Sequence, residues 1–427
     1  MRPSIGRTHS YRWVVLAVFS LLNLVVEMNW LAFAPITREC MIFYHTAAMT
    51  ILMLSMSFMV LYLLVSLPAS YVIDTYGIRT GVGIGALLTG GCGLLRGIYA
   101  SNLTMVIVFQ CGLAVGQPFV LNAITKVASA FPVRERATAS GIPIMAQFIG
   151  IIAAFLLSPV LLKESVVAGA TSYDIKRVLM LYGYASLVGA ITFLLFIRNQ
   201  PSTAAVGALT VARLSFFAGL KRLFKQRDMV LLVLLFFIGL GLFNSISTFL
   251  ELILVPKGLG KVEAGQVGGI MMVGGIIGAA ILPALSDRFQ NRKTFLVLGL
   301  TGLIPGLVGL TFASDYGYLM ASSFAFGFFL IGAAPIGFQY SAEVSHPVPE
   351  ATSQGMIILA GQIGGIALIT VVGLLGHVTI QSLAGVAQSS SNLTRFMIIF
   401  IMLAMGNVIV SLMLGKSATV RLSGNEQ

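Results

Sequence analysis

The sequence predicts an all-α membrane protein with twelve transmembrane helices in two pseudo-symmetric six-helix bundles. Of the 427 residues, 57% are hydrophobic and only 9% are charged, whereas soluble domains carry about 25% charged residues. The apolar residues form segments that each reach the roughly 20 residues needed to cross a bilayer. Two loop motifs also recur half a chain apart, which indicates a duplicated six-helix unit.

The first half contains six apolar segments bounded by charged or turn-forming residues. The first segment follows Arg2, Arg7 and Arg12 but is too long for a signal peptide, and it carries Trp30 where a small-residue cleavage site would be expected. We therefore predict that it is the first span. The predicted spans are residues 13–36, 47–73, 80–100, 104–126, 139–162 and 178–197.

The second half repeats this pattern after the longest polar link in the chain, which is rich in Lys and Arg. Six further spans are predicted at residues 229–255, 264–286, 294–313, 317–342, 355–376 and 395–414. The predicted domains are therefore an N-terminal bundle (1–197), a cytoplasmic basic linker (198–228) and a C-terminal bundle (229–427).

The charge distribution indicates membrane topology rather than nucleic-acid binding. The formal net charge is +12, but the basic residues stand singly between apolar segments and form no soluble basic face. With the amino terminus inside, most Lys and Arg lie on the inner side, as the positive-inside rule requires. We expect a monomeric, multi-pass protein of the cell (plasma or cytoplasmic) membrane, surrounded by lipid, with both termini cytoplasmic and no nucleic-acid partner.

No pattern for catalysis or metal binding is present. The three cysteines form no CxxC pair, the histidines are scattered, and there is no Walker loop or HExxH motif. The polar residues of the spans do not place a nucleophile beside a base. The sequence therefore predicts no metal, no cofactor and no enzymatic activity.

The repeated loops contain an acidic residue, a turn and a basic residue. The sequence DTYGIR runs from Asp74 to Arg79, and DRFQNR runs from Asp287 to Arg292, half a chain later. A second pair, PVRERATASG from Pro132 and PVPEATSQG from Pro347, recurs at almost the same spacing. Two different motifs that repeat at nearly one spacing indicate duplication.

The acidic-turn-basic loops resemble the major facilitator superfamily loop GxLADRxGRK. This resemblance implies the major facilitator fold and a conformational latch, a gating role, at Asp74, Gly77, Arg79, Asp287, Arg288 and Arg292. The copies depart from the pattern at Ser70 and Thr75 in the first and at Pro283 and Gln290 in the second. A carboxylate at a helix end can pair with a nearby arginine and hold helices together. The alternative is that these are ordinary loop charges.

Other matches follow the same order along the chain: Tyr11 to Val15, Asn29-Trp30, Leu67 to Ser70, Gln117, Gln147, Phe243 to Thr248, Gly337-Phe338, Glu343 and Gln362. They are similar to the transporters related to the feline leukaemia virus subgroup C receptor, a group linked to haem and to choline or ethanolamine. The resemblance implies that Trp30, Gln147 and Gln362 face a central cavity. Asn244 stands where the choline-handling members carry an aromatic residue, so half of an aromatic cage is present.

Glu27 is an ionisable residue near the middle of the first span, where a charge is costly and usually functional. Asn23, Glu27 and Trp30 follow helical spacing and form one stripe, which we expect to face a cavity rather than lipid. The carboxylate is a candidate site for coupling to a proton or cation. The alternative is a carboxylic acid that only bonds a neighbouring helix. Glu27 is not part of the family resemblance.

Neutral polar residues complete the predicted substrate site, with Trp30 as the partner for a cation or a planar ring. Gln117, Gln147 and Gln362 suit the orientation of a polar solute, and Asn244 begins a polar stripe in the seventh span. Gln147 and Gln362 repeat at the spacing of the second loop motif, so we expect them to be pseudo-symmetric partners. Hydrogen bonding between helices is the alternative role. Arg96, Lys126 and Glu343 lie near span ends and are assigned structural roles.

These features predict a secondary active or facilitative transporter that moves a small polar or cationic organic solute by alternating access. Its partners would be this solute and, as coupling ion, a proton or cation. Two alternatives remain at this point. One is a polyspecific exporter of amphipathic compounds, and the other is a membrane receptor or sensor that does not transport.

Overall fold

The computed structural model describes residues 5–128, 130–131, 136–167, 170–197, 223–345, 350–375 and 386–415. Within these ranges, 12 helices are long and apolar enough to cross a membrane, which confirms the predicted fold class. Internal contacts divide the chain into two units, Met1–Ala204 and Ala205–Gln427. Residues 198–222 of the predicted linker lie outside the described ranges.

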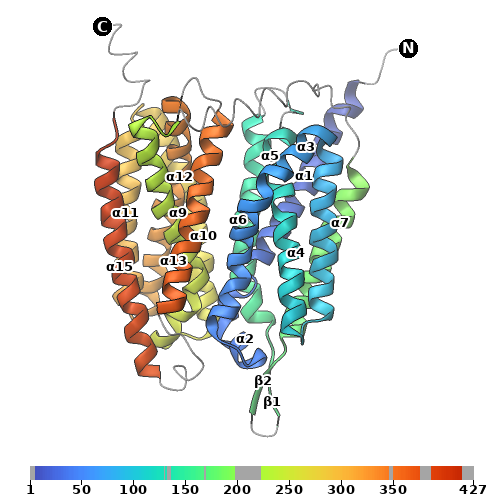
Figure 1. Cartoon of the computed structure of the whole chain (residues 1–427), viewed down its shortest axis with the longest axis vertical. Coiled ribbons are helices and arrows are strands. Elements are labelled where there is room, and N and C mark those ends of the chain that lie inside the picture. The colour runs from blue at the N-terminus through green and yellow to red at the C-terminus, as the bar shows by residue number, and fades with distance from the viewer. Residues whose placement is uncertain are drawn as a thin grey trace. The chain divides into compact units, whose positions relative to one another are not determined.

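The first unit contains the first six spans (Figure 1). Its helices are α1 (Ile5–Trp30), η1 (Ala34–Ile36), α2 (Thr37–Tyr44), α3 (Ala48–Ile98), α4 (Leu103–Leu121), α5 (Ile124–Ala128), α6 (Arg136–Leu161) and α7 (Ile175–Phe196). Helix α3 includes two spans, Ala48–Ile73 and Thr75–Ile98. Helix α1 packs against α6 and α7, and α3 packs against α4 and α7.

The second unit contains the other six spans. Its helices are α9 (Arg227–Leu254), η3 (Val255–Lys257), α10 (Lys261–Arg288), α11 (Arg292–Phe312), α12 (Tyr316–Ser345), α13 (Glu350–Leu375) and α15 (Val386–Leu412). The main packing pairs are α10 with α12, α11 with α12, and α9 with α13.

A short β-hairpin adds to the predicted all-helical architecture. Strand β1 (Glu164–Val167) pairs antiparallel with β2 (Ala170–Tyr173) between α6 and α7. The sequence pattern did not predict this hairpin, because a pair of four-residue strands is too short to show a clear alternation of apolar and polar residues.

One close helix crossing is repeated in the two units. A Cβ atom on Gly150 of α6 would lie 2.1 Å from the carbonyl oxygen of Leu24 in α1. In the second unit, a Cβ atom on Gly364 of α13 would lie 1.9 Å from the carbonyl oxygen of Phe237 in α9. Each partner of the second crossing follows its counterpart in the first at nearly the spacing of the loop motifs. The helix packing therefore carries the same duplication as those motifs.

The two acidic-turn-basic loops each have a positive φ angle at the same position. Gly77 has a φ angle of 84°, and Gln290, at the equivalent place in the second loop, has a φ angle of 49°. Both φ angles are positive, although Gly77 also has an extended ψ of 172° and the second copy has no glycine at this place. A side chain in this region costs about 1 to 2 kcal/mol. The second copy therefore has a positive φ angle in spite of local strain.

Candidate functional site

The predicted stripe on α1 is buried, and each of its three residues bonds to a different helix. Asn23, Glu27 and Trp30 expose 0%, 5% and 7% of their surface. Glu27 Oε1 accepts a hydrogen bond from Gln117 Nε2 of α4 at 2.9 Å. Asn23 Oδ1 accepts one from Gln147 Nε2 of α6 at 2.9 Å. Two predicted substrate-binding glutamines are therefore held against the same face of α1.

The third residue of the stripe is fixed to α3. The indole N–H of Trp30 donates a hydrogen bond to the carbonyl oxygen of Ser55 at 3.2 Å. This bond restricts rotation of the ring, so the indole is held in one orientation. A fixed aromatic ring near a carboxylate on the same helix is suited to bind an organic cation.

No described cation pairs with the Glu27 carboxylate. Within the described residues, its one hydrogen bond is the neutral donor Gln117, which contacts Oε1. Arg96, a buried cation of the same unit, instead bonds amide groups. A buried carboxylate with no cation beside it among the described residues can bind a proton or, when ionised, a positively charged ligand.

Arg96 corrects a prediction from the sequence. Its place near a span end suggested a side chain that reaches toward the membrane surface, but its exposure is 0%. The guanidinium donates hydrogen bonds to Gln110 Oε1 and to Asn29 Oδ1. Gln110 stands two helical turns before Gln117 on α4, so both amides lie on one helix face. That spacing is the signal in the sequence that could have revealed this cluster.

Asn244 and Gln362 belong to the second unit. Asn244 lies on α9 and is 5% exposed, and Gln362 lies on α13, which packs against α9. Close to Asn244, the hydroxyls of Ser247 and Thr248 are buried and find no hydrogen-bond partner among the described residues. This side of α9 therefore holds polar groups with unused bonding capacity. The roles of Asn244 and Gln362 in substrate binding stay predictions.

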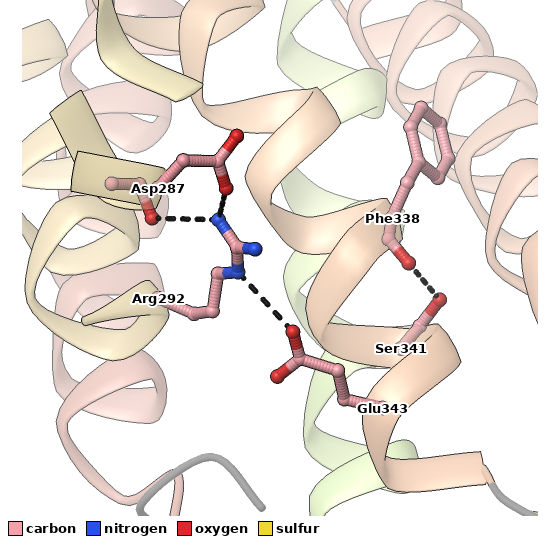
Figure 2. Close-up of polar contacts among 6 residues, drawn as sticks. Asp287, Arg292, Phe338, Ser341 and Glu343 are labelled. Carbon is pink, nitrogen blue, oxygen red and sulfur yellow. Dashed lines mark hydrogen bonds and ion pairs between the residues drawn. The ribbon is translucent and has the colours of Figure 1, made fainter. Parts of the chain in front are cut away.

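The second acidic-turn-basic loop forms a charged cluster, shown in Figure 2. Arg292, at the start of α11, donates a hydrogen bond from Nη1 to Asp287 of α10. Its Nε atom lies 3.3 Å from Glu343 Oε1 on α12. The side chains of Arg292, Asp287 and Glu343 are 16%, 63% and 11% exposed. One arginine thus joins three helices, α10, α11 and α12.

Glu343 was assigned a structural role from the sequence, and the structure makes it the third charge of this cluster. Its counterpart in the first half, at the spacing of the second loop motif, is Ala128, so the first copy has no carboxylate at that position. Arg288 is exposed and lies outside the cluster, and Arg79 of the first copy is also exposed. The side chain of Asp74 lies outside the described residues.

The chain matches the profile of a known protein family and resembles several known relatives. The profile of the Major Facilitator Superfamily matches residues 15–369. Solute carrier family 49 member A3 of Danio rerio is 31% identical over 369 residues, which cover 82% of this chain and 76% of that protein. The choline/ethanolamine transporter FLVCR2 of Homo sapiens is 28% identical over 377 residues, which cover 85% of this chain and 72% of that protein.

Solved structures share the fold at low sequence identity. A bacterial homolog of the human lysosomal transporter Spinster superposes with a TM-score of 0.73 and 14% identity, over 94% of this chain and 96% of that one. A D-xylose-proton symporter superposes with a TM-score of 0.72 and 13% identity, over 93% and 97%. These likenesses concern the fold alone.

Proposed function

The chain belongs to the Major Facilitator Superfamily of multi-pass membrane transporters, and from this premise we propose that it carries a small organic ammonium cation by alternating access. The observation that supports this substrate class is the buried Glu27 carboxylate one helical turn from Trp30. The relatives named as choline/ethanolamine transporters support an amino alcohol of similar size.

The arrangement favours an amine with N–H groups over a quaternary ammonium. A quaternary ammonium is best bound by several aromatic rings, but Asn244 replaces the second aromatic residue expected from the family resemblance. An amine can instead donate a charge-assisted hydrogen bond to a carboxylate. Within the described residues, Oε2 of Glu27 takes no hydrogen bond, whereas Oε1 is occupied by Gln117. We therefore propose an ethanolamine-like cation as the preferred substrate.

The charged cluster of the second unit supports the conformational part of the proposal. Arg292 ties α10 to α12 through carboxylates of unequal exposure. An ion pair that is present in only one conformational state stabilises the state in which it forms, by an amount equal to its interaction energy. We propose that this cluster acts as a latch, and that Glu27 exchanges a proton for the cation, so that solute and proton compete for one carboxylate.

Substrate charge provides the test. The full-length protein in proteoliposomes would be assayed for uptake of labelled ethanolamine, competed by choline and by 3,3-dimethylbutanol, the neutral isostere of choline. We expect ethanolamine to compete best and the neutral alcohol least. Glu27→Gln should remove the preference for cations, whereas Glu263→Gln, at the helix start near Gly260, should retain it.

Two results would reject the proposed substrate. One is equal competition by the neutral alcohol in the wild-type protein, and the other is a preference for choline over ethanolamine. Transport of large amphipathic cations and neutral dyes at similar rates would instead favour the polyspecific exporter.

A further inference from the structure

A second buried polar cluster adjoins the proposed site and contains Arg96, which has no part in the proposed function. Arg96 is fully buried at the end of α3. Its Nη1 atom donates to Gln110 Oε1, and its Nη2 atom donates to Asn29 Oδ1 at 2.5 Å. Its guanidinium carbon lies 5.5 Å from the centre of the Phe33 ring.

The guanidinium determines which way both amides point. An arginine has five N–H donors and no acceptor, so only the oxygen of a side-chain amide can face it. Each amide must then direct its NH2 group to the opposite side. Gln110 Nε2 donates to the carbonyl oxygens of Leu54 at 3.2 Å and Asn29 at 3.5 Å. A glutamine at this position without the arginine could rotate by half a turn and lose both contacts.

The second amide is oriented in the same way. Asn29 Nδ2 donates to the carbonyl oxygen of Val25 at 2.7 Å and to Ser186 Oγ of α7 at 2.9 Å. Asn29 therefore anchors the end of α1 to α7 while Arg96 holds its oxygen.

These contacts stand directly beside Trp30. Gln110 bridges the carbonyl groups of Asn29 in α1 and Leu54 in α3. The next residue in each helix, Trp30 and Ser55, forms the hydrogen bond that fixes the indole. The register of α1 against α3 at the ring is thus set by the amide of Gln110.

We infer that Arg96 is a positioning residue for the substrate site, because its guanidinium orients the amides of Gln110 and Asn29, and these hold the segment that carries the Trp30 indole. The inference rests on the proposed function, since it takes Trp30 as the residue that contacts the cation. Arg96 itself does not contact the substrate.

A buried charge is a costly way to hold two helices together, because burial removes its hydration. Within the described residues, the hydrogen-bond partners of Arg96 are neutral amides, so no carboxylate offsets this cost. A neutral donor such as a second glutamine could pack there but could itself rotate and accept hydrogen bonds. The guanidinium group has N–H donors and no acceptor, which explains why an arginine occupies this position.

The test uses the fact that the chain has 2 tryptophans, Trp13 and Trp30. In the full-length Trp13→Phe protein, Trp30 is the sole fluorescent indole, so acrylamide quenching reports how accessible and mobile that ring is. Arg96→Met removes the guanidinium group, and Arg96→Lys keeps the positive charge without its planar shape. Gln110→Glu keeps a partner for Arg96 but has no NH2 group to donate to the carbonyl oxygens of Asn29 and Leu54. Cys92→Ala, one turn before Arg96 on α3, is the matched control.

We expect Arg96→Met and Gln110→Glu to increase quenching of Trp30 several-fold. The KM for ethanolamine uptake should rise about tenfold, the factor for losing one well-oriented interaction, while the maximal rate stays within about twofold. Arg96→Lys should give an intermediate KM, because it donates without the planar fork. Cys92→Ala should match the Trp13→Phe parent.

Unchanged quenching and KM in folded Arg96→Met and Gln110→Glu would overturn the inference. If Arg96→Met does not fold, Gln110→Glu decides alone, because it leaves the arginine paired. A raised KM without increased quenching would also contradict a positioning role. If the wild-type protein takes up no ammonium cation, the proposed function fails, but the quenching arm still tests whether Arg96 positions the ring.

Discussion

In the charged cluster of the second unit, the two carboxylates around Arg292 can be ranked by the strength of their interaction with the arginine. The Arg292 and Glu343 side chains are 16% and 11% exposed, and their closest atoms are 3.3 Å apart. A charged hydrogen bond of this kind is worth about 1.5 to 3 kcal/mol. Asp287 is 63% exposed, and exposed pairs typically contribute about 0.2 to 1 kcal/mol. We therefore predict that Glu343→Gln destabilises the protein more than Asp287→Asn.

Double-mutant cycles measure the coupling energy of each ion pair, because the other effects of each single substitution cancel. Arg292→Met would be combined separately with Glu343→Gln and with Asp287→Asn, and unfolding would be followed by detergent titration. We expect a coupling energy of about 1.5 kcal/mol or more for Glu343 and about 0.5 kcal/mol for Asp287. If the coupling is present in one transport state only, a loss of about 1.4 kcal/mol shifts the balance between the states about tenfold.

Two outcomes would contradict the energy ranking or the latch. A coupling energy for Asp287 equal to or greater than that for Glu343 would show that exposure does not rank these pairs. Full coupling in both cycles together with unchanged transport in all variants would reject the latch while leaving the ion pairs as structural contacts.

Four further predictions concern single residues. Asp74→Asn should reduce transport more than thermal stability, because a latch carboxylate is needed in one state; wild-type uptake by a folded variant would contradict this. Gln147→Ala and Gln362→Ala should each weaken substrate binding by roughly 1 to 3 kcal/mol, measured by isothermal titration, and unchanged affinity in both would reject their assignment. The KM for a cation should rise as pH falls between about 8 and 5, because protonation removes the negative charge, and Glu27→Gln should flatten this profile. Gln290→Gly should stabilise the protein by about 1 kcal/mol, seen as a higher melting temperature, because it relieves a left-handed φ angle.

The sequence predicted which residues share a helix face, but not which residues of other helices they contact. Helical spacing grouped Asn23, Glu27 and Trp30 correctly on one buried face, because the helix period alone places them there. The same reasoning could not show that Gln117 bonds Glu27 or that Gln147 bonds Asn23. Those pairs depend on how α4 and α6 rotate against α1, and rotation depends on packing along the whole helix.

The sequence by itself determined the membrane class, the twelve spans and the duplication, because hydrophobic length and repeat spacing are local properties of the chain. It also marked Asp287 and Arg292 as a related pair. Only the tertiary structure brought Glu343 to Arg292 and buried Arg96 among Gln110 and Asn29. These contacts join residues on different helices, and the energy of a charge depends on its neighbours and its solvent access, which no linear pattern specifies.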